Sequence, residues 1–313
     1  MRSPVENGAK GDSEASPSVG LFLVTAMAIL MGVNFPFMKI ALADIPVLTY
    51  RVFNLVVAGL GLFAIAKASG HRISVPRPEV RPLIVCALFN MTFWHILSAY
   101  GLALIEASRM TIIAHTMPIW VAPLSVLILG ERLSARRLVS LALGTLGLAV
   151  LIGPDIARVG SAPLGALLTL AAAISWALGA VLTKHYRFSA VTPVLVGWQL
   201  LIGVVPIVAA AAIVDPLPDP RNWSLTSTLV LTYTATVPSM FGIWAFFRLL
   251  HMFPATVTAI GTLSIPTVGV LTSALVLGES IGLGELAALA LVSAAVALSM
   301  ARSKPVAASP KSD

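Results

Sequence analysis

Apolar residues form ten long runs along the chain, and short polar segments separate them. The runs cover residues 20–42, 47–66, 82–101, 107–128, 138–153, 163–183, 191–213, 224–247, 255–277 and 283–301. Most contain the roughly 20 residues that a helix needs to cross about 30 Å of hydrocarbon. The fifth run is short, and Pro238 interrupts the Thr-rich eighth run. The pattern predicts an all-α polytopic membrane protein with ten transmembrane helices.

An internal duplication divides these runs into two sets of five. Residues 107–151 align without a gap with residues 255–299, and thirteen of the 45 aligned pairs are identical. Pro118 falls on Pro266, and a matched proline carries more weight than a matched alanine or leucine in so apolar a chain. Since a repeat dictates architecture, we predict a first repeat at 19–153 and a second at 154–301. The polar tails are 1–18 and 302–313.

The positions of the positive charges predict the topology. With the N-terminus inside, the inner segments hold 15 of the 20 Lys and Arg residues, the outer segments hold four, and Arg51 lies within a run. Positive residues stay on the cytoplasmic side. Because each half has five helices, an odd number, the second half must be inverted. Loop 131–137 reads ERLSARR and its repeat at 279–285 reads ESIGLGE, as expected for opposite sides. Both termini are therefore expected in the cytoplasm.

Composition supports the membrane assignment and removes one competing class. The chain is 58% apolar and 11% charged, whereas soluble domains carry about 25% charged residues. The net charge of +7 follows from the topology, so nucleic acid is not an expected partner.

Several short motifs resemble those of a known family. The spacing from Pro118 to Glu131 recurs from Pro266 to Glu279, and the first run ends Met31-Gly32-Val33-Asn34-Phe35, with Trp176 in the matching place of the second half. With Tyr50-Arg51, this pattern resembles the EamA domain of the drug/metabolite transporter (DMT) superfamily, although Met31 stands where that family often has tryptophan. The resemblance spans residues 20–301. It implies a ten-helix carrier in the plasma membrane that exports or exchanges small metabolites through a central cavity between the halves.

Polar and aromatic residues inside the runs are the candidates for that cavity, because polar groups within a bilayer are costly. Asn90, Trp94 and Ser98 are spaced by four and are expected on one helical stripe. His95 and His115 could carry a proton, or simply pack. The threonines could bond only their own backbone. The expected cavity residues are Asn34, Asn90, Trp94, His95, Thr111, His115, Trp176, Tyr233, Trp244 and Thr262.

Three charged residues have alternative interpretations. Arg51 could bind a substrate carboxylate or phosphate, but snorkelling to the outer interface, or pairing with Asp44 or another helix, is the favoured expectation. Glu131 and Glu279 are expected to cap a following helix or to pair with a cation, not to bind solute.

The sequence therefore predicts a secondary transporter for small organic solutes such as amino acids, working by alternating access, with no catalytic residue, metal or cofactor. Walker A and HExxH sequences are absent, which argues against ATP drive and zinc proteolysis. The lipid bilayer and a small-molecule substrate are the expected partners, while protons and a homodimer stay open. The alternatives are a lipid-modifying enzyme using His251 with Arg248 or His71 with Arg72, a non-transporting scaffold or channel, and a sugar-phosphate or nucleotide-sugar exchanger. The exchanger would need more basic cavity residues than Arg51.

Overall fold

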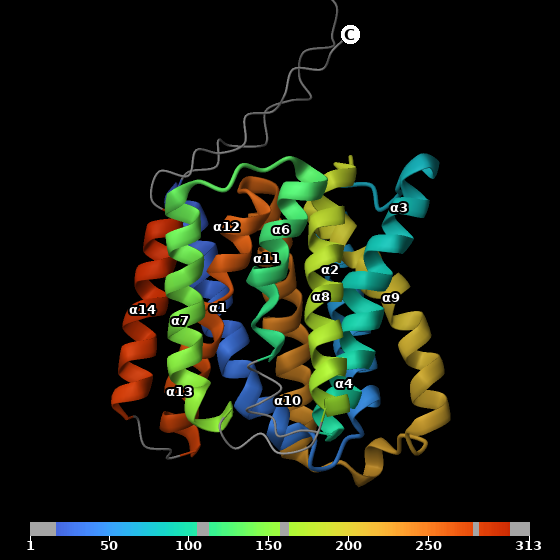
Figure 1. Cartoon of the computed structure of the whole chain (residues 1–313). Coiled ribbons are helices and arrows are strands. Elements are labelled where there is room, and N and C mark those ends of the chain that lie inside the picture. The colour runs from blue at the N-terminus through green and yellow to red at the C-terminus, as the bar shows by residue number, and fades with distance from the viewer. Residues whose placement is uncertain (1–16, 105–112, 157–162, 278–281, 301–313) are drawn as a thin grey trace, which may run out of the picture.

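The structure is a computed structural model that describes residues 17–104, 113–156, 163–277 and 282–300. Every regular element within these residues is helical, as predicted (Figure 1). The elements are α1 (Pro17–Ala41), α2 (Val47–Ala68), α3 (Arg77–Ala87), η1 (Leu88–Phe93), α4 (Trp94–Leu104), α6 (Met117–Leu129), α7 (Ala135–Ile156), α8 (Pro163–Tyr186), α9 (Thr192–Val214), η2 (Pro220–Asn222), α10 (Leu225–Thr236), η3 (Val237–Gly242), α11 (Ile243–Met252), α12 (Ala255–Gly261), α13 (Ser264–Leu277) and α14 (Leu283–Met300).

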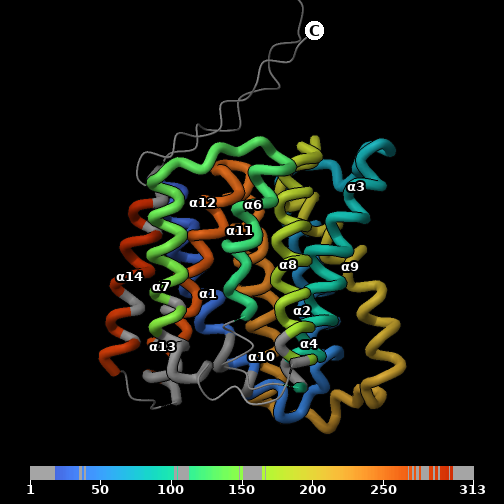
Figure 2. The backbone as a smooth tube through the Cα atoms, viewed as in Figure 1, coloured from blue at the N-terminus to red at the C-terminus, as the bar shows by residue number. Residues whose placement is uncertain are grey.

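The helices stand side by side in one bundle, as the backbone trace also shows (Figure 2). Helix α2 packs along α9, α7 along α14, α1 along α13, and α8 along both α4 and α6. In Figure 1, α7, α13 and α14 form one flank and α3, α4 and α9 the other, with α6, α11 and α12 between them. Segments far apart in sequence therefore form most of the interior.

The observed helices follow the predicted runs with a few differences in their ends. Helix α1 begins at Pro17, inside the expected N-terminal tail, and α7 ends at Ile156, beyond the expected repeat boundary at residue 153. The third run is longer than expected and covers α3, η1 and α4. The ninth run is not one helix, because it divides into α12 and α13. The expected C-terminal tail, 302–313, lies outside the described residues.

The surface of the bundle is apolar, which indicates a membrane protein. Among the described residues, five helices are long and apolar enough to cross a membrane: Val47–Ala68, Arg77–Gly101, Leu167–Tyr186, Thr192–Val214 and Leu225–Met252. Large apolar side chains such as Leu127 (79% exposed) and Ile213 (84% exposed) point outward. Buried positions of α8 carry alanines instead, at Ala172, Ala173, Ala177 and Ala180. Small residues inside and large ones outside allow close helix packing when lipid is the solvent.

Two of the long segments contain a π-helical turn near their middle. The turn η1 joins α3 to α4, and η3 joins α10 to α11. Pro238 accounts for η3, because its ring removes one backbone donor and crowds the carbonyl of residue 234. Such turns inside helices occur frequently at functional sites.

Two further segments are interrupted next to prolines. Turns at residues 115–116 and 262–263 precede α6 and α13. Pro118 and Pro266 follow them closely, and each proline disfavours a helical carbonyl four residues earlier. Pro118 thus explains the interruption before α6, and Pro266 explains why the ninth run divides.

The η1 turn is held against α9 at Gly203. A Cβ added to Gly203 would meet Met91 Cβ and lie 3.0 Å from the carbonyl oxygen of Ala87. The Thr92 hydroxyl donates a hydrogen bond of 2.7 Å to the Gly203 carbonyl. The contacts involve backbone and Cβ atoms, so they cannot be relieved by a rotamer change.

We predict that Gly203→Ala destabilises the protein by about 1–3 kcal/mol through overpacking. The measurement is the thermal unfolding of purified protein in detergent. Gly284→Ala is the matched control, because its new Cβ would approach nothing closer than the Val150 carbonyl at 3.9 Å. Equal unfolding temperatures for the two variants would contradict the prediction.

Candidate functional site

Asn90 lies at the centre of a buried polar network that joins three helical segments. Its amide donates 2.7 Å to Gln199 Oε1 on α9 and 3.1 Å to Thr183 Oγ1 on α8. Asn90 and Gln199 have no exposed surface. Asn90 Oδ1 has no hydrogen-bond partner in the structure, and it faces Gly179, where any Cβ would collide with it. A buried acceptor without a partner is costly, so this oxygen is a locally unfavourable feature of an otherwise paired network.

A second polar cluster joins α2 to α4. Arg51 Nη1 lies 3.5 Å from His95 Nδ1, and Arg51 Nη2 lies 3.5 Å from Ser98 Oγ. Both distances are at the long limit for a hydrogen bond, whose usual N–H···O length is about 2.9–3.0 Å. Arg51 Nε and His95 Nε2 are buried without a partner. Of the expected partners of Arg51, Asp44 is not used, because it bonds Ser224 and Ser227, whereas the expected contact with another helix is made to α4.

Aromatic side chains lie beside these clusters. The rings of Trp94 on α4 and Trp176 on α8 meet edge-to-face at 5.3 Å, and Trp176 lies 5.5 Å from Phe246 on α11. Both tryptophans are half-buried, whereas Phe246 is buried. The two predicted tryptophans therefore come together, and Phe246, which the sequence did not single out, completes the group.

The predicted stripe of Asn90, Trp94 and Ser98 borders two different helices. Asn90 lies in the π-helical turn over Leu88–Phe93, whereas Trp94 and Ser98 lie one turn apart in α4. Asn90 and Trp94 contact α8, while Ser98 contacts Arg51 on α2. The stripe therefore links the α8 contacts to the polar cluster on α2.

The remaining predicted residues lie apart from one another. Tyr233 packs edge-to-face on Phe37, and Trp244 packs on Phe241. The Thr262 hydroxyl donates 2.7 Å to the Ala259 carbonyl of its own helix. Asn34 is half-buried in α1, with Oδ1 buried and unpartnered. His115 is half-buried at the turn before α6, and Thr111 lies outside the described residues.

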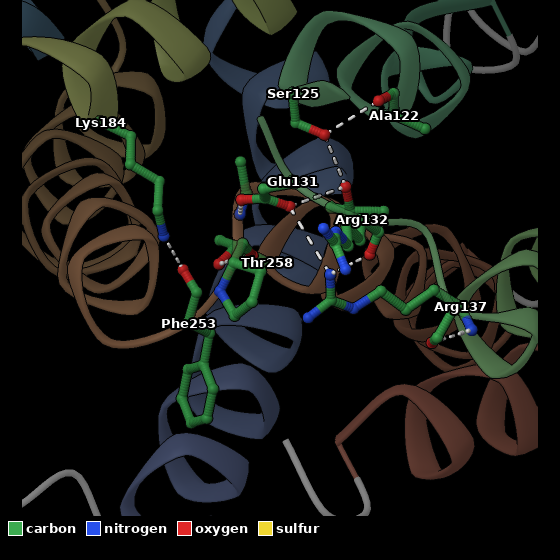
Figure 3. Close-up of polar contacts among 12 residues, drawn as sticks. Ala122, Ser125, Glu131, Arg132, Arg137, Lys184, Phe253 and Thr258 are labelled. Atoms are coloured by element: carbon green, nitrogen blue, oxygen red, sulfur yellow. Dashed lines mark hydrogen bonds and ion pairs between the residues drawn. The ribbon is translucent and has the colours of Figure 1, made fainter. Parts of the chain in front are cut away.

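A charged network closes one end of the bundle (Figure 3). The Ala255 N–H donates 2.8 Å to Glu131 Oε1, so Glu131 caps the start of α12. Arg137 Nη1 lies 3.9 Å from Glu131 Oε2. The Lys184 ammonium donates to the Phe253 carbonyl and, at 2.9 Å, to the Leu250 carbonyl at the end of α11. The expected capping and pairing of Glu131 are thus observed, while Glu279 lies outside the described residues.

At the other end of the bundle, aspartates accept hydrogen bonds from groups near the starts of helices. Asp215 Oδ2 accepts from the Thr49 N–H at 2.7 Å and from the Thr49 hydroxyl at 2.8 Å, near the start of α2. Asp44 Oδ2 accepts from the hydroxyls of Ser224 and Ser227, both at 2.6 Å. The Ser224 and Ser227 hydrogen bonds lower the pKa of Asp44 below its usual value. These contacts hold the ends of helices together and leave the polar and aromatic clusters enclosed between them.

Comparison with known proteins gives one family. The model of the EamA-like transporter family matches residues 18–153 and again residues 163–301. The chain is 29% identical to the "Uncharacterized transporter YvbV" of Bacillus subtilis (strain 168), over 90% of the chain and 92% of that protein. It is also 29% identical to a "Probable amino-acid metabolite efflux pump" of Escherichia coli (strain K12), over 82% of the chain and 86% of that protein. A solved structure described as "Crystal structure of protein" has the same fold, with a TM-score of 0.78 at 18% identity over 91% of this chain and 98% of that one.

We predict that Asn90 and Gln199 are energetically coupled. A double-mutant cycle with Asn90→Ala and Gln199→Ala is expected to give a coupling energy of about 0.6–1.7 kcal/mol, the range for hydrogen bonds between membrane helices. The measurement is equilibrium unfolding in mixed micelles. Additive effects of the two substitutions would show that this contact contributes nothing to stability.

Proposed function

Since the chain belongs to the EamA-like transporter family, we propose that it is a secondary transporter that exports or exchanges small organic metabolites, such as amino acids, across the cell membrane. Its two halves form ten spans in opposite orientation and work by alternating access. Both termini are cytoplasmic. The observation that carries the proposal is a set of paired features that the two family matches, 18–153 and 163–301, have in common.

Helix packing supports the inverted arrangement. In each half the order is one long helix, a second helix, a segment with a π-turn, a segment next to a proline turn, and a last helix. The second helices, α2 and α9, pack on each other, and so do the last helices, α7 and α14. Contact between counterparts is what a pseudo-two-fold axis in the membrane plane produces.

The π-turns provide a closer match. The turns at 88–93 and 237–242 differ by a constant 149 positions, which places Ser239 on Asn90. Asn90 bonds Gln199 on α9 at 2.7 Å, and Ser239 bonds Asn54 Oδ1 on α2 at 2.9 Å. Each bond thus joins a π-turn of one half to an amide on the second helix of the other.

The loops before the second helices of the two halves also make corresponding hydrogen bonds. Asp44 lies three residues before α2, and Ser189 lies three residues before α9. Ser224 N–H donates to Asp44 at 3.1 Å, and Ser189 N–H donates to Glu79 at 3.2 Å. Ser224 and Glu79 both lie at the start of a third segment, so the two contacts correspond, with carboxylate and serine exchanged.

The charge distribution supports cytoplasmic termini. The end of the bundle that contains Glu131 also carries Arg132, Arg137 and Lys184 (Figure 3), while the contacts at the other end are made by Asp44 and Asp215. Positive residues mark the cytoplasmic side, which supports a cytoplasmic location for the network of Figure 3. Proton coupling and a homodimer stay predictions.

The first test is transport. Purified protein in liposomes is expected to give saturable counterflow of radiolabelled amino acids. Trp176→Ala is expected to weaken apparent affinity about tenfold, because it removes the shared ring of the aromatic group, worth about 0.5–1.5 kcal/mol per contact beyond the area it buries. Trp223→Ala is the control, because Trp223 pairs with Phe53 beside the loop before α10. Folded protein without counterflow for any amino acid would contradict the proposed substrate class.

The second test is topology. Cys86 is the one cysteine of the chain and it is buried, so Cys86→Ala gives a background for single-cysteine labelling. Ala135→Cys and Gly282→Cys are exposed positions at the starts of α7 and α14. We expect a membrane-impermeant thiol reagent to label Gly282→Cys in intact cells and to reach Ala135→Cys only after permeabilisation. Labelling of both from the same side would refute the inverted arrangement.

A further inference from the structure

We propose that Arg51, with Ser98 and His95, is the binding site for a carboxylate of the transported solute. This inference rests on the proposed transport function and adds the chemical group that the site recognises. The three side chains come from α2 and α4 and meet below the bundle surface, where His95 is 7% exposed and Ser98 has no exposed surface.

The first argument is the charge of Arg51. No carboxylate in the described part of the chain is placed as its ion-pair partner, since the carboxylates on the neighbouring loops, Asp44 and Asp215, bond serine and threonine groups. Arg51 is half-buried and its Nε is buried, and a cation held partly out of water without a counter-charge is costly. A guanidinium kept in an apolar bundle at this cost is typical of a functional group.

The second argument is the loose hydrogen bonding of the cluster. The guanidinium contacts to His95 and Ser98 are each 3.5 Å long, and Arg51 Nε and His95 Nε2 are buried and unpartnered. A carboxylate accepts two parallel N–H bonds from a guanidinium and could accept a third from the Ser98 hydroxyl, in place of its 3.3 Å bond to the His95 carbonyl. Such a ligand would give these donors the short contacts that the protein itself does not provide.

The third argument concerns the size of the charge and the surroundings. One guanidinium matches a singly charged carboxylate, whereas a phosphate dianion would call for further basic groups. Trp94 lies four residues before Ser98 on the same helix, about one turn or 5.4 Å along the axis. The group of Trp94, Trp176 and Phe246 can therefore receive the apolar part of a solute whose carboxylate is bound at Arg51.

The test compares ligands that differ only in this group. The assay measures how strongly four compounds inhibit counterflow of a labelled amino acid into liposomes. Phenylalanine is the reference, phenylalaninamide keeps the ring and the ammonium group, and 3-phenylpropanoate keeps the ring and the carboxylate. Phenyl phosphate tests a phosphate in place of the carboxylate. For the wild-type protein, phenylalaninamide should inhibit at least about 30-fold more weakly than phenylalanine, since an unpaired buried charge costs about 2 kcal/mol or more. 3-Phenylpropanoate should inhibit, and phenyl phosphate should not exceed it.

Variants assign the effect to Arg51. Arg51→Gln should abolish the preference for acid over amide, and Arg51→Lys should keep part of it, because the charge remains but the two-point geometry is lost. The matched control is Arg221→Gln, an exposed arginine in η2, which should behave like wild type.

The outcomes separate the two proposals. Equal inhibition by phenylalanine and its amide in the wild type overturns the carboxylate site without touching the transport function, as does a full preference in a folded Arg51→Gln protein. Stronger inhibition by phenyl phosphate assigns the site to phosphate and overturns the carboxylate. If the wild-type protein shows no counterflow, the proposed transport function itself is contradicted. The wild-type comparison needs no variant, so it decides the question even if the Arg51 variants do not fold.

Discussion

Every backbone donor inside a bilayer must find a partner within the protein, and this constraint explains where the charges of the chain are used. Three carboxylates, those of Asp44, Glu131 and Asp215, each accept a hydrogen bond from a backbone N–H at the start of a helix, and Glu79 accepts one from Ser189 in the loop before α9. In each case the carboxylate and the N–H belong to different family-matched segments, so these contacts also tie the two segments together. The interior is then built from neutral amides, hydroxyls and rings, with Arg51 as a cation between them.

Much of the fold follows directly from the sequence. The runs that set α2 and α9 were predicted within a residue or two at each end, because each is continuously apolar and is bounded by polar or proline-containing loops. The effect of Pro118 on its helix was also predictable, since a proline acts on its own carbonyl four residues earlier. These features depend on neighbouring residues in the sequence, so they can be predicted without knowing which helices pack together.

The site was harder to predict because its contacts are long-range. Trp94 and Trp176 were both singled out, yet their contact depends on how α4 packs on α8. Phe246 was missed, and the helix that Arg51 contacts could not be named, because only the fold shows that Arg51 lies against α4 and not against Asp44. One signal was available: Arg51 lies within the apolar run 47–66. The π-turn at 88–93 contains no proline, so no local sequence rule predicts it.

The exchange of carboxylate and serine between the Asp44–Ser224 and Glu79–Ser189 contacts has a mechanical consequence for the proposed alternating-access carrier. The two contacts follow one plan but use different atoms, so the free energy of breaking one need not equal that of breaking the other. The molecule would then rest more often open to one compartment. Such a bias alters the solute concentration at which each face half-saturates, while the sign of net flux is still dictated by the gradient alone.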